Sequence, residues 1–281
     1  MSDETDRLFL KGFAEEVEEL LGEDDGPQFE VYDGDESRVV IYWVDPNQGN
    51  VSTPFAYSLA RNCANMGQRV MGIIRLGGSH QIDMRNSAIK SFLEIPDKPE
   101  WLISWDTDME LIEATALRDL IDHAEEYEAR IATCLGFMQR PDMIMNRPDL
   151  EGLTPWMPSP HLMFLDEDSG HYWMDLNYEK DVPQWCDATG MGFTLMHRTL
   201  LEEMQDDEHP WHEIVDGYGH DVYFSHKAGK LGSKVLYCAD IKSRHWKAFG
   251  LDEQMFDRAW EGLEKPTVEM AMLGQEQGPG I

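Results

Sequence analysis

The feature that most constrains the fold is a regular alternation of apolar runs and amphipathic segments that begins at Arg38. After its first residue, the run 38–44 (RVVIYWV) is apolar, β-branched and aromatic, which is typical of a strand buried on both faces. Two more strands are expected at 69–76 and 101–105, and helices at 54–66, 83–94 and 114–129. In the first helix, Thr53 is expected as the N-cap and Gly67 as the stop. Strands that alternate with helices predict an α/β fold with a parallel central sheet.

The second half of the chain has a different, mixed pattern. The segment 161–176 predicts a hairpin that turns at Asp168, Ser169 and Gly170. A strand, a short helix, a longer helix and a last strand are then expected at 189–197, 198–204, 219–232 and 234–241. A sheet-forming half followed by a mixed half is typical of one domain with a donor side and an acceptor side.

The first 36 residues differ in composition from the rest, because they hold 14 acidic and two basic residues. Apolar residues recur there at helical spacing between Leu8 and Leu21, which predicts a short amphipathic helix followed by a solvated linker. Three units are therefore expected: an acidic N-terminal helix and linker at 1–36, one α/β domain at 37–250, and a C-terminal helix and flexible tail at 251–281.

The charge balance restricts the partners of the chain. There are 54 acidic and 23 basic residues, for a net charge of −31. Such a field repels nucleic acid and anionic lipid, so no non-specific nucleic-acid binding is expected. No apolar run approaches the roughly 20 residues that span a bilayer, so no membrane insertion is expected. The N-terminus lacks a basic signal region and the four cysteines are scattered, which favours a cytoplasmic location. The acidity also suits a high-salt cytoplasm.

Two carboxylates, Asp106 and Asp108, follow the expected strand 101–105 with only Thr107 between them. In an extended segment, residues i and i+2 point to the same side, so both side chains are expected to project together at the carboxyl end of the strand. Ligands of open α/β sheets bind at that end. Neighbouring carboxylates repel unless a cation or a proton lies between them, and Mg²⁺ or Mn²⁺ prefers oxygen ligands and bridges to diphosphates. The pair therefore predicts a metal–diphosphate site, and the alternative is a helix cap or an Asx turn.

The order of these motifs resembles a known family. A strand followed by DTDM, a preceding helix that carries Arg85 and Asn86, then TGMGF, GHD and a late His245 are similar to the GT-A fold of nucleotide-sugar glycosyltransferases, close to the family 2 type. The resemblance covers roughly 38–249. It implies a Rossmann-like, mostly parallel sheet flanked by helices, with a smaller hairpin region on the acceptor side.

The resemblance also implies how the donor side is built. Asp108 would bind Mn²⁺ or Mg²⁺ directly, Asp106 would contact the donor ribose or the metal through water, and His245 would complete the metal site. The loop after the first strand matches the place where the nucleotide base docks. The residues expected to contact the donor are therefore Asp45, Pro46, Arg85, Asn86 and Asp106. The donor is expected to be a UDP-, GDP- or dTDP-sugar. The nucleotide stays open, because RLGGSHQ stands where the family often has acidic residues.

On the acceptor side, Asp221 of GHD matches the acidic position that serves inverting members as general base. His220 stands where a glutamate is usual, so a retaining mechanism also stays open. The residues expected to approach the acceptor are Gly190, Gly192, Trp211 and His212, since glycines allow close approach and sugars stack on aromatic rings. The acceptor itself is not predicted.

Three other functions share some of these features. A haloacid-dehalogenase-like phosphatase also uses D-x-D after a strand, but it wants Thr or Val where this chain has Glu110, and it places the motif on its first strand. A nucleotidyltransferase needs a basic glycine-rich loop after the first strand, and VDPNQGN has no base. A non-enzymatic acidic interaction protein would use the charge alone and leaves the strand-end carboxylates unexplained. The sequence therefore favours an enzyme, a metal-dependent glycosyltransferase.

Overall fold

The structure of the chain is a computed structural model. It describes residues 37–45, 51–77, 80–140, 157–205, 210–215, 218–246, 250–262 and 268–269. The helix expected between Leu8 and Leu21, its linker and Pro46 lie outside the described residues, so the boundaries proposed for the three units stay a prediction.

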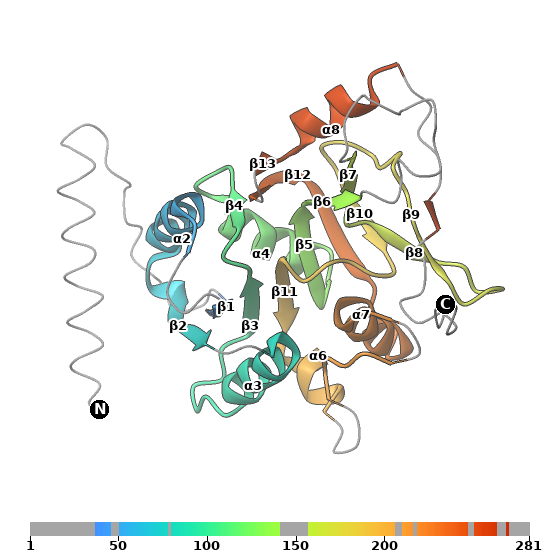
Figure 1. Cartoon of the computed structure of the whole chain (residues 1–281). Helices are drawn as coiled ribbons and strands as arrows, with labels where there is room; N and C mark the ends of the chain where they lie inside the picture. Colours follow the sequence, from blue (N-terminus) through green and yellow to red (C-terminus); the bar gives the residue numbers. More distant parts are fainter. Residues whose placement is uncertain are drawn as a thin grey trace, which may run out of the picture.

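A twisted sheet forms the centre of the molecule (Figure 1). Its strands lie in the order β10-β12-β5-β11-β3-β1-β2. Their bounds are Pro183–Cys186, Val235–Trp246, Ile131–Leu135, Phe193–His197, Trp101–Trp105, Val39–Asp45 and Val70–Gly77, in the same order. Strands β1, β2, β3, β5 and β12 run in one direction, while β10 and β11 run in the other. The expected α/β class with a mostly parallel sheet is confirmed.

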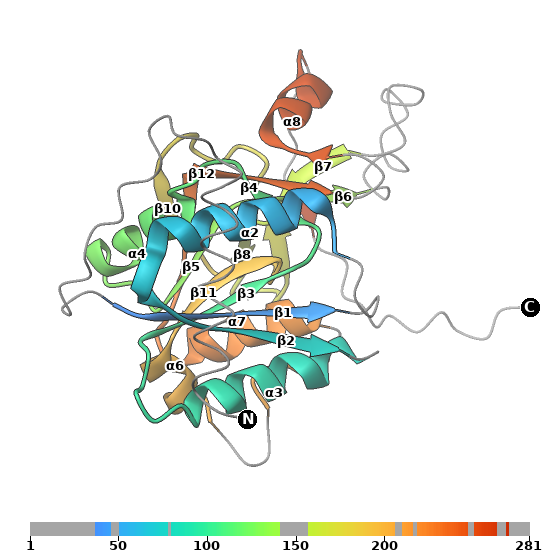
Figure 2. The ribbon, with the colours of Figure 1, turned by 90° about the vertical axis from the view of Figure 1, so that its left-hand side faces the viewer.

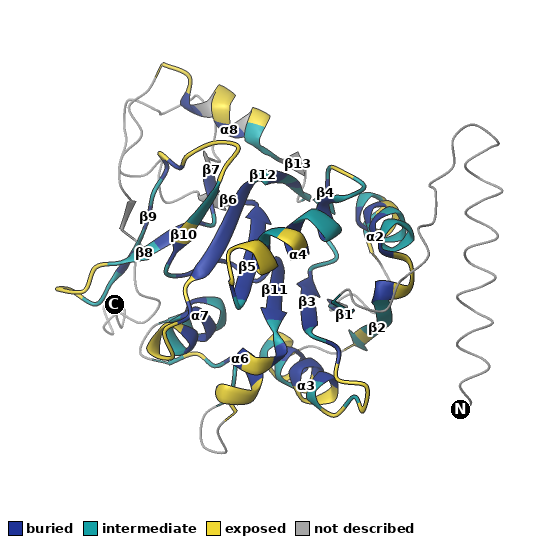
Figure 3. Cartoon of the chain, turned by 180° about the vertical axis from the view of Figure 1, so that it is seen from behind, coloured by how far each residue is buried: buried dark blue, intermediate teal, exposed yellow. Residues whose placement is uncertain are grey.

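Helices cover both faces of this sheet (Figure 2). One face is covered by α2 (Thr53–Met66) and α4 (Ala116–Glu126). The other is covered by α3 (Gln81–Leu93), α6 (Arg198–Glu203) and α7 (His220–Lys230). Two apolar clusters fill the space between the layers. The central strands are buried, while β2 and β10 at the two edges of the sheet and the outer faces of the helices are partly or fully exposed (Figure 3). The burial of both sheet faces explains why the strands read as continuous apolar runs.

Several shorter elements complete the fold. The pair β8 (Met163–Leu165) and β9 (Tyr172–Met174) forms the expected hairpin, with Gly170 in the left-handed region at its turn. The remaining elements are η1 (Gly67–Arg69), β4 (Met109–Leu111), β6 (Phe137–Arg140), β7 (Met157–Pro160), β13 (Gly250–Leu251), α8 (Glu253–Trp260) and β14 (Val268–Glu269). Phe256 and Trp260 of α8 belong to the same apolar cluster as α3, α6 and α7.

The start of α2 differs by one residue from the expectation. The N-cap is Ser52 rather than Thr53, because the hydroxyl of Ser52 accepts from the backbone N–H of Phe55 at 3.2 Å. The same hydroxyl donates to the backbone carbonyl of Thr107 at 2.9 Å, so one side chain both starts the helix and holds the D-x-D segment.

Strand β5 was not expected, although it lies near the middle of the sheet. Its five residues follow α4 after only a short turn, so the apolar run merges with the apolar face of the helix in the sequence. All four cysteines are free, and none of the helices in the described part of the chain is long and apolar enough to cross a membrane.

Candidate functional site

Three segments from distant parts of the sequence meet at one edge of the sheet. Asp106 directly follows β3, and His245 lies near the carboxyl end of β12. Strand β11 runs antiparallel to β3, with Phe193 opposite Trp105, so the segment that precedes β11 lies beside Asp106. The backbone N–H of Asp106 donates to the carbonyl of Gly192 at 2.7 Å. The topology therefore brings the D-x-D motif, TGMGF and the late histidine together.

The D-x-D motif is a turn and not an extension of β3, which corrects the expectation for its geometry. The strand ends at Trp105, and the N–H of Met109 donates to the carbonyl of Asp106 at 3.0 Å. In a turn of this kind the i and i+2 side chains no longer share a side. Asp106 reaches Arg85 and Asp108 reaches His245, so the two carboxylates act on different partners.

The pair of Asp108 and His245 is held by main-chain contacts on both sides. Strand β4 pairs with the end of β12, where Met109 lies opposite His245, and the N–H of Trp246 donates to the carbonyl of Asp108 at 2.7 Å. Nδ1 of His245 lies 2.9 Å from the carbonyl oxygen of Phe137, and it must be the donor because a carbonyl only accepts. Nε2 then faces Oδ2 of Asp108 at 3.2 Å.

This arrangement places an imidazole lone pair against a carboxylate oxygen, unless a cation or a second proton lies between them. A histidine that binds a metal typically donates its other N–H to a backbone carbonyl, as His245 does to Phe137. Among the described residues there is no group of three or more His, Cys, Asp or Glu side chains around one position. Asp106, Asp108 and His245 thus do not form the expected group of three metal ligands, because Asp106 pairs with Arg85. Asp108 and His245 could hold a divalent cation as two protein ligands, with the remaining positions left to diphosphate oxygens and water.

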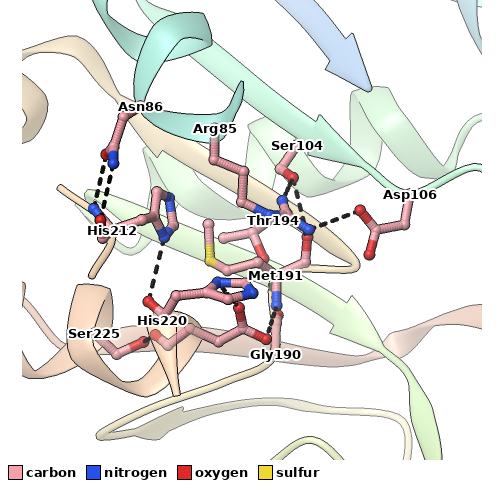
Figure 4. A network of polar contacts seen from close by, with 11 residues as sticks. Arg85, Asn86, Ser104, Asp106, Gly190, Met191, Thr194, His212, His220 and Ser225 are labelled. Atoms are coloured by element: carbon pink, nitrogen blue, oxygen red, sulfur yellow. Dashed lines mark hydrogen bonds and ion pairs between the residues drawn. The ribbon is translucent and has the colours of Figure 1, made fainter. Parts of the chain in front are cut away.

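Arg85 is buried beneath the motif and anchors Asp106. Its side chain is 1% exposed, and Nη2 lies 2.8 Å from Oδ1 of Asp106. Nη1 donates to Oγ of Ser104 and, at 3.3 Å, to the carbonyl of Met191 (Figure 4). Burial raises the pKa of the Asp106 carboxyl, Arg85 opposes this, and the charge of Asp108 adds to the rise. The guanidinium is enclosed and meets the site through Asp106, and its expected contact with the donor stays a prediction.

Asn86, Trp211 and His212 also have packing roles. The amide of Asn86 donates to the carbonyl of His212 at 2.8 Å and accepts from its N–H at 2.9 Å. The ring of His212 is fully buried and stacks on Phe224 at 4.9 Å between centroids. The indole N–H of Trp211 donates to the carbonyl of Leu201 at 2.8 Å while its ring packs on the core. These contacts fix the 210–215 segment to α3, α6 and α7. The expected contact of Asn86 with the donor and the acceptor platform of Trp211 and His212 stay predictions.

Gly190 and Gly192 allow side chains to approach the backbone closely. A Cβ at Gly190 would lie 2.3 Å from Nδ1 of His161, so the imidazole occupies the place of a side chain. A Cβ at Gly192 would meet Met109 at 3.4 Å and Oδ2 of Asp106 at 3.8 Å, which are ordinary contacts. The ring of His161 lies 6.4 Å from that of His245. A close approach is therefore found at Gly190 alone of the two, where His161 makes it, and the expected approach of donor and acceptor to the two glycines stays a prediction.

Asp221 lies in the first turn of α7 and faces Met191, between the two glycines. Its Oδ2 accepts from the N–H of Met191 at 3.3 Å, and its Oδ1 is in contact with Nδ1 of His220. Burial raises the pKa of the Asp221 carboxyl, but the hydrogen bond and charge of His220, together with Arg85, hold it well below the usual value. The carboxyl is therefore ionised at neutral pH.

The expected nucleotide loop is described only in part. Asp45 is the last residue of β1, which pairs with β3 so that Tyr42 lies opposite Ser104. The backbone of Asp45 thus lies at the same edge of the sheet as Asp106, while its side chain and Pro46 lie outside the described residues. Their contact with a donor stays a prediction.

The sequence analysis missed three residues that build this site. Ser104 is the polar residue in the apolar run of β3, and this interruption was a usable signal. Met191 contributes through its backbone, which no side-chain pattern reports. His161 stands alone before the hairpin, and only the fold brings it against Gly190.

Comparison with protein-family models finds no match to this sequence, and no curated protein matches it. Among solved structures, the chain is similar to the crystal structure of A197 from STIV, with a TM-score of 0.51 over 78% of this chain and 91% of that chain. The two sequences are 17% identical, so the likeness shows the fold alone. That neighbour has a GT-A-like fold. The chain therefore has a GT-A-like fold, as the order of its motifs predicted.

Proposed function

We propose that this chain is a metal-dependent glycosyltransferase that moves a sugar from a nucleotide-diphosphate donor to an acceptor hydroxyl with inversion. The observation that carries the proposal is the pair of Asp108 and His245 at the carboxyl edge of a GT-A-like sheet. Nε2 of His245 and Oδ2 of Asp108 face each other at 3.2 Å, which supports a cation bound by both. Main-chain groups, including the carbonyl of Phe137, hold the two residues in this position.

In this proposal, different residues serve the donor side and the acceptor side of the site. Asp108 and His245 would hold Mn²⁺ or Mg²⁺, which would supply positive charge to a departing diphosphate. Asp106, oriented by Arg85, offers a partly exposed carboxylate for the donor ribose. Asp221 stands on the acceptor side and serves to activate the attacking hydroxyl. The chain's strong negative charge makes a local cation the natural receiver of a diphosphate.

The test combines a donor screen with one charge-neutral substitution. Release of nucleoside diphosphate is measured for UDP-, GDP- and dTDP-sugars with Mn²⁺, and calorimetry measures Mn²⁺-dependent binding of UDP, GDP and dTDP. Asp108→Asn should abolish Mn²⁺-dependent binding, because it removes one of two protein ligands. Asp168→Asn, which removes the same charge from the exposed hairpin turn, is the matched control and should bind as the wild type does.

Two outcomes contradict the proposal. If nucleotide binding by Asp108→Asn stays as strong and as dependent on Mn²⁺ as in the wild type, the assignment of the metal site is wrong. If the wild type hydrolyses none of these nucleotide sugars and binds none of these nucleotides, the proposed class of donor is wrong.

A further inference from the structure

Next to Asp221 lies a histidine whose place in the site the function proposed above does not use. His220 is the first residue of α7, and its Nδ1 is in contact with Oδ1 of Asp221. Its side chain is 19% exposed, so the ring is partly accessible to solvent. Within the described part of the chain, Nε2 of His220 makes no hydrogen bond. A carboxylate thus lies at one ring nitrogen, and the other nitrogen is available.

Two hydrogen bonds hold this pair, one to the backbone of His220 and one to the carboxylate of Asp221. The carbonyl of His220 accepts from Nδ1 of His212 at 3.2 Å, and the ring of His212 is buried against Phe224 of the same helix. Oδ2 of Asp221 accepts from Met191, whose neighbour Gly192 holds the N–H of Asp106. The pair therefore keeps a set position relative to Asp106, and Figure 4 shows His220 beside His212 and the Gly190–Met191 segment.

Chemically, Asp221 alone is a poor final receiver for the proton of the acceptor hydroxyl. Its pKa lies well below the usual value, and a base works best when its pKa is near the working pH. Imidazole is the side chain whose charge changes near neutral pH. When a carboxylate contacts one ring nitrogen, it sets the tautomer and stabilises the imidazolium, which leaves the other nitrogen as the base.

We propose that His220 is the general base of the transfer and that Asp221 is its positioning residue. As the acceptor oxygen bonds to the anomeric carbon, the bond from that carbon to the diphosphate oxygen breaks, and its electron pair leaves with the diphosphate. The acceptor O–H bond breaks in the same step, and the proton goes to Nε2 of His220. This inference rests on the function proposed above and specifies how its acceptor side works.

The charged and titratable groups that face His220 are consistent with this role. Asp221 lies on the same helix, and His212 packs from the 210–215 segment. Arg85 and Asp106 act on Asp221 from α3 and from the end of β3, and they pair with each other. His212 stays neutral because burial, Arg85 and His220 lower its pKa to about 3. Asp221 is thus the unpaired negative charge next to the ring.

The first arm of the test measures hydrolysis of the most active nucleotide sugar from the donor screen, with water as the acceptor. His220→Ala should lower kcat about 10²–10⁴-fold and leave KM for the donor unchanged, because no donor contact is lost. The fall of kcat at low pH should disappear in the variant, and added imidazole should restore part of the rate. Asp221→Asn should lower kcat without rescue by imidazole. His123→Ala, a partly exposed histidine of α4 on the other face of the sheet, is the matched control and should keep the wild-type rate.

The second arm needs no substrate. ¹⁵N NMR of the histidine rings above their titration should find the proton of His220 on Nδ1 and a lone pair on Nε2, and Asp221→Asn should shift this proton toward Nε2. A proton found on Nε2 in the wild type overturns the proposal, and so does a His220→Ala variant with the wild-type rate and pH profile. If the wild type turns over no nucleotide sugar at all, both the proposed function and this inference fall. If it does and only His220→Ala is neutral, the function stands and the inference alone falls.

Discussion

Gly190 is the position in the site where one added carbon atom, a Cβ, would overlap with a neighbouring side chain. His161 packs on its backbone, and a Cβ there would lie 2.3 Å from Nδ1 of that ring. The ring in turn lies next to His245, so a displacement reaches the candidate metal site. The two glycines of TGMGF therefore have different roles, although the sequence presents them as equivalent.

From this difference we expect that Gly190→Ala is strongly disruptive and Gly192→Ala is not. Gly190→Ala must push His161 aside and should cost about 1–3 kcal/mol of stability, as overpacking of a close contact does. It should also weaken Mn²⁺-dependent nucleotide binding. Gly192→Ala is the matched control, because its Cβ would meet Met109 at an ordinary 3.4 Å. Urea unfolding and calorimetry measure both effects, and equal behaviour of the two variants would contradict this account.

At the scale of elements, the 210–215 segment is attached to the fold by a buried histidine that stays neutral. Burial, with the charges of Arg85 and His220, lowers the pKa of His212 from 6.5 to about 3. The unfolded chain takes up a proton near pH 6.5, while the folded chain does not do so until about pH 3. This contribution to stability is therefore complete above pH 6.5 and is lost as the pH falls toward 3.

The pH dependence can be tested with a side chain that does not titrate. Between pH 7 and pH 5, His212 should make the free energy of unfolding fall by about 2 kcal/mol, from the linkage of proton binding to folding. His212→Asn keeps a donor for the carbonyl of His220 and should be less stable than the wild type at pH 7. Its free energy of unfolding should not show the fall of about 2 kcal/mol between pH 7 and pH 5 that His212 causes. His80→Asn is the control and should keep it. Urea titrations at the two pH values measure the difference, and an unchanged slope in His212→Asn would refute the assignment.

Elements with a continuous apolar pattern were predictable from the sequence, and contacts between elements were not. Strand β3 has the expected bounds, and β1 differs by one residue, because the burial of both faces leaves an unbroken apolar run. The turn at Asp106 was missed because the alternation rule was applied beyond the end of the strand. The burial of His212 depends on Phe224 and Asn86, which are brought to it only by the fold. The resemblance predicted that the D-x-D motif, TGMGF and His245 lie at one edge of the sheet, as they do, but only the structure shows their contacts.

At the scale of the whole molecule, the core and the candidate site of the described part of the chain are built from residues that follow Ser37. Both apolar clusters begin at β1, and Nε of Arg69 donates to the carbonyl of Ser37 at 3.0 Å. A chain that begins at Ser37 keeps these contacts and loses 14 acidic and two basic residues.

We therefore expect that this shorter chain folds and retains the donor hydrolysis of the full chain. Circular dichroism with thermal unfolding tests the first part, and release of nucleoside diphosphate tests the second. The full chain is the control under the same salt concentration, because the two differ in net charge. A shorter chain that does not fold would show that the segment between Leu8 and Leu21 belongs to the core.

The tripeptide from Gly190 to Gly192 contacts both the side of the site that holds Asp106 and the side that holds Asp221. The N–H of Met191 is bonded to Asp221, its carbonyl to Ser104, and the carbonyl of Gly192 to the N–H of Asp106. A chimaera that took its donor half from this chain and its acceptor half from another protein of the same fold would need these bonds on both sides of its junction. Under the proposed function, donor preference and acceptor preference would therefore have to be exchanged together or redesigned around this tripeptide.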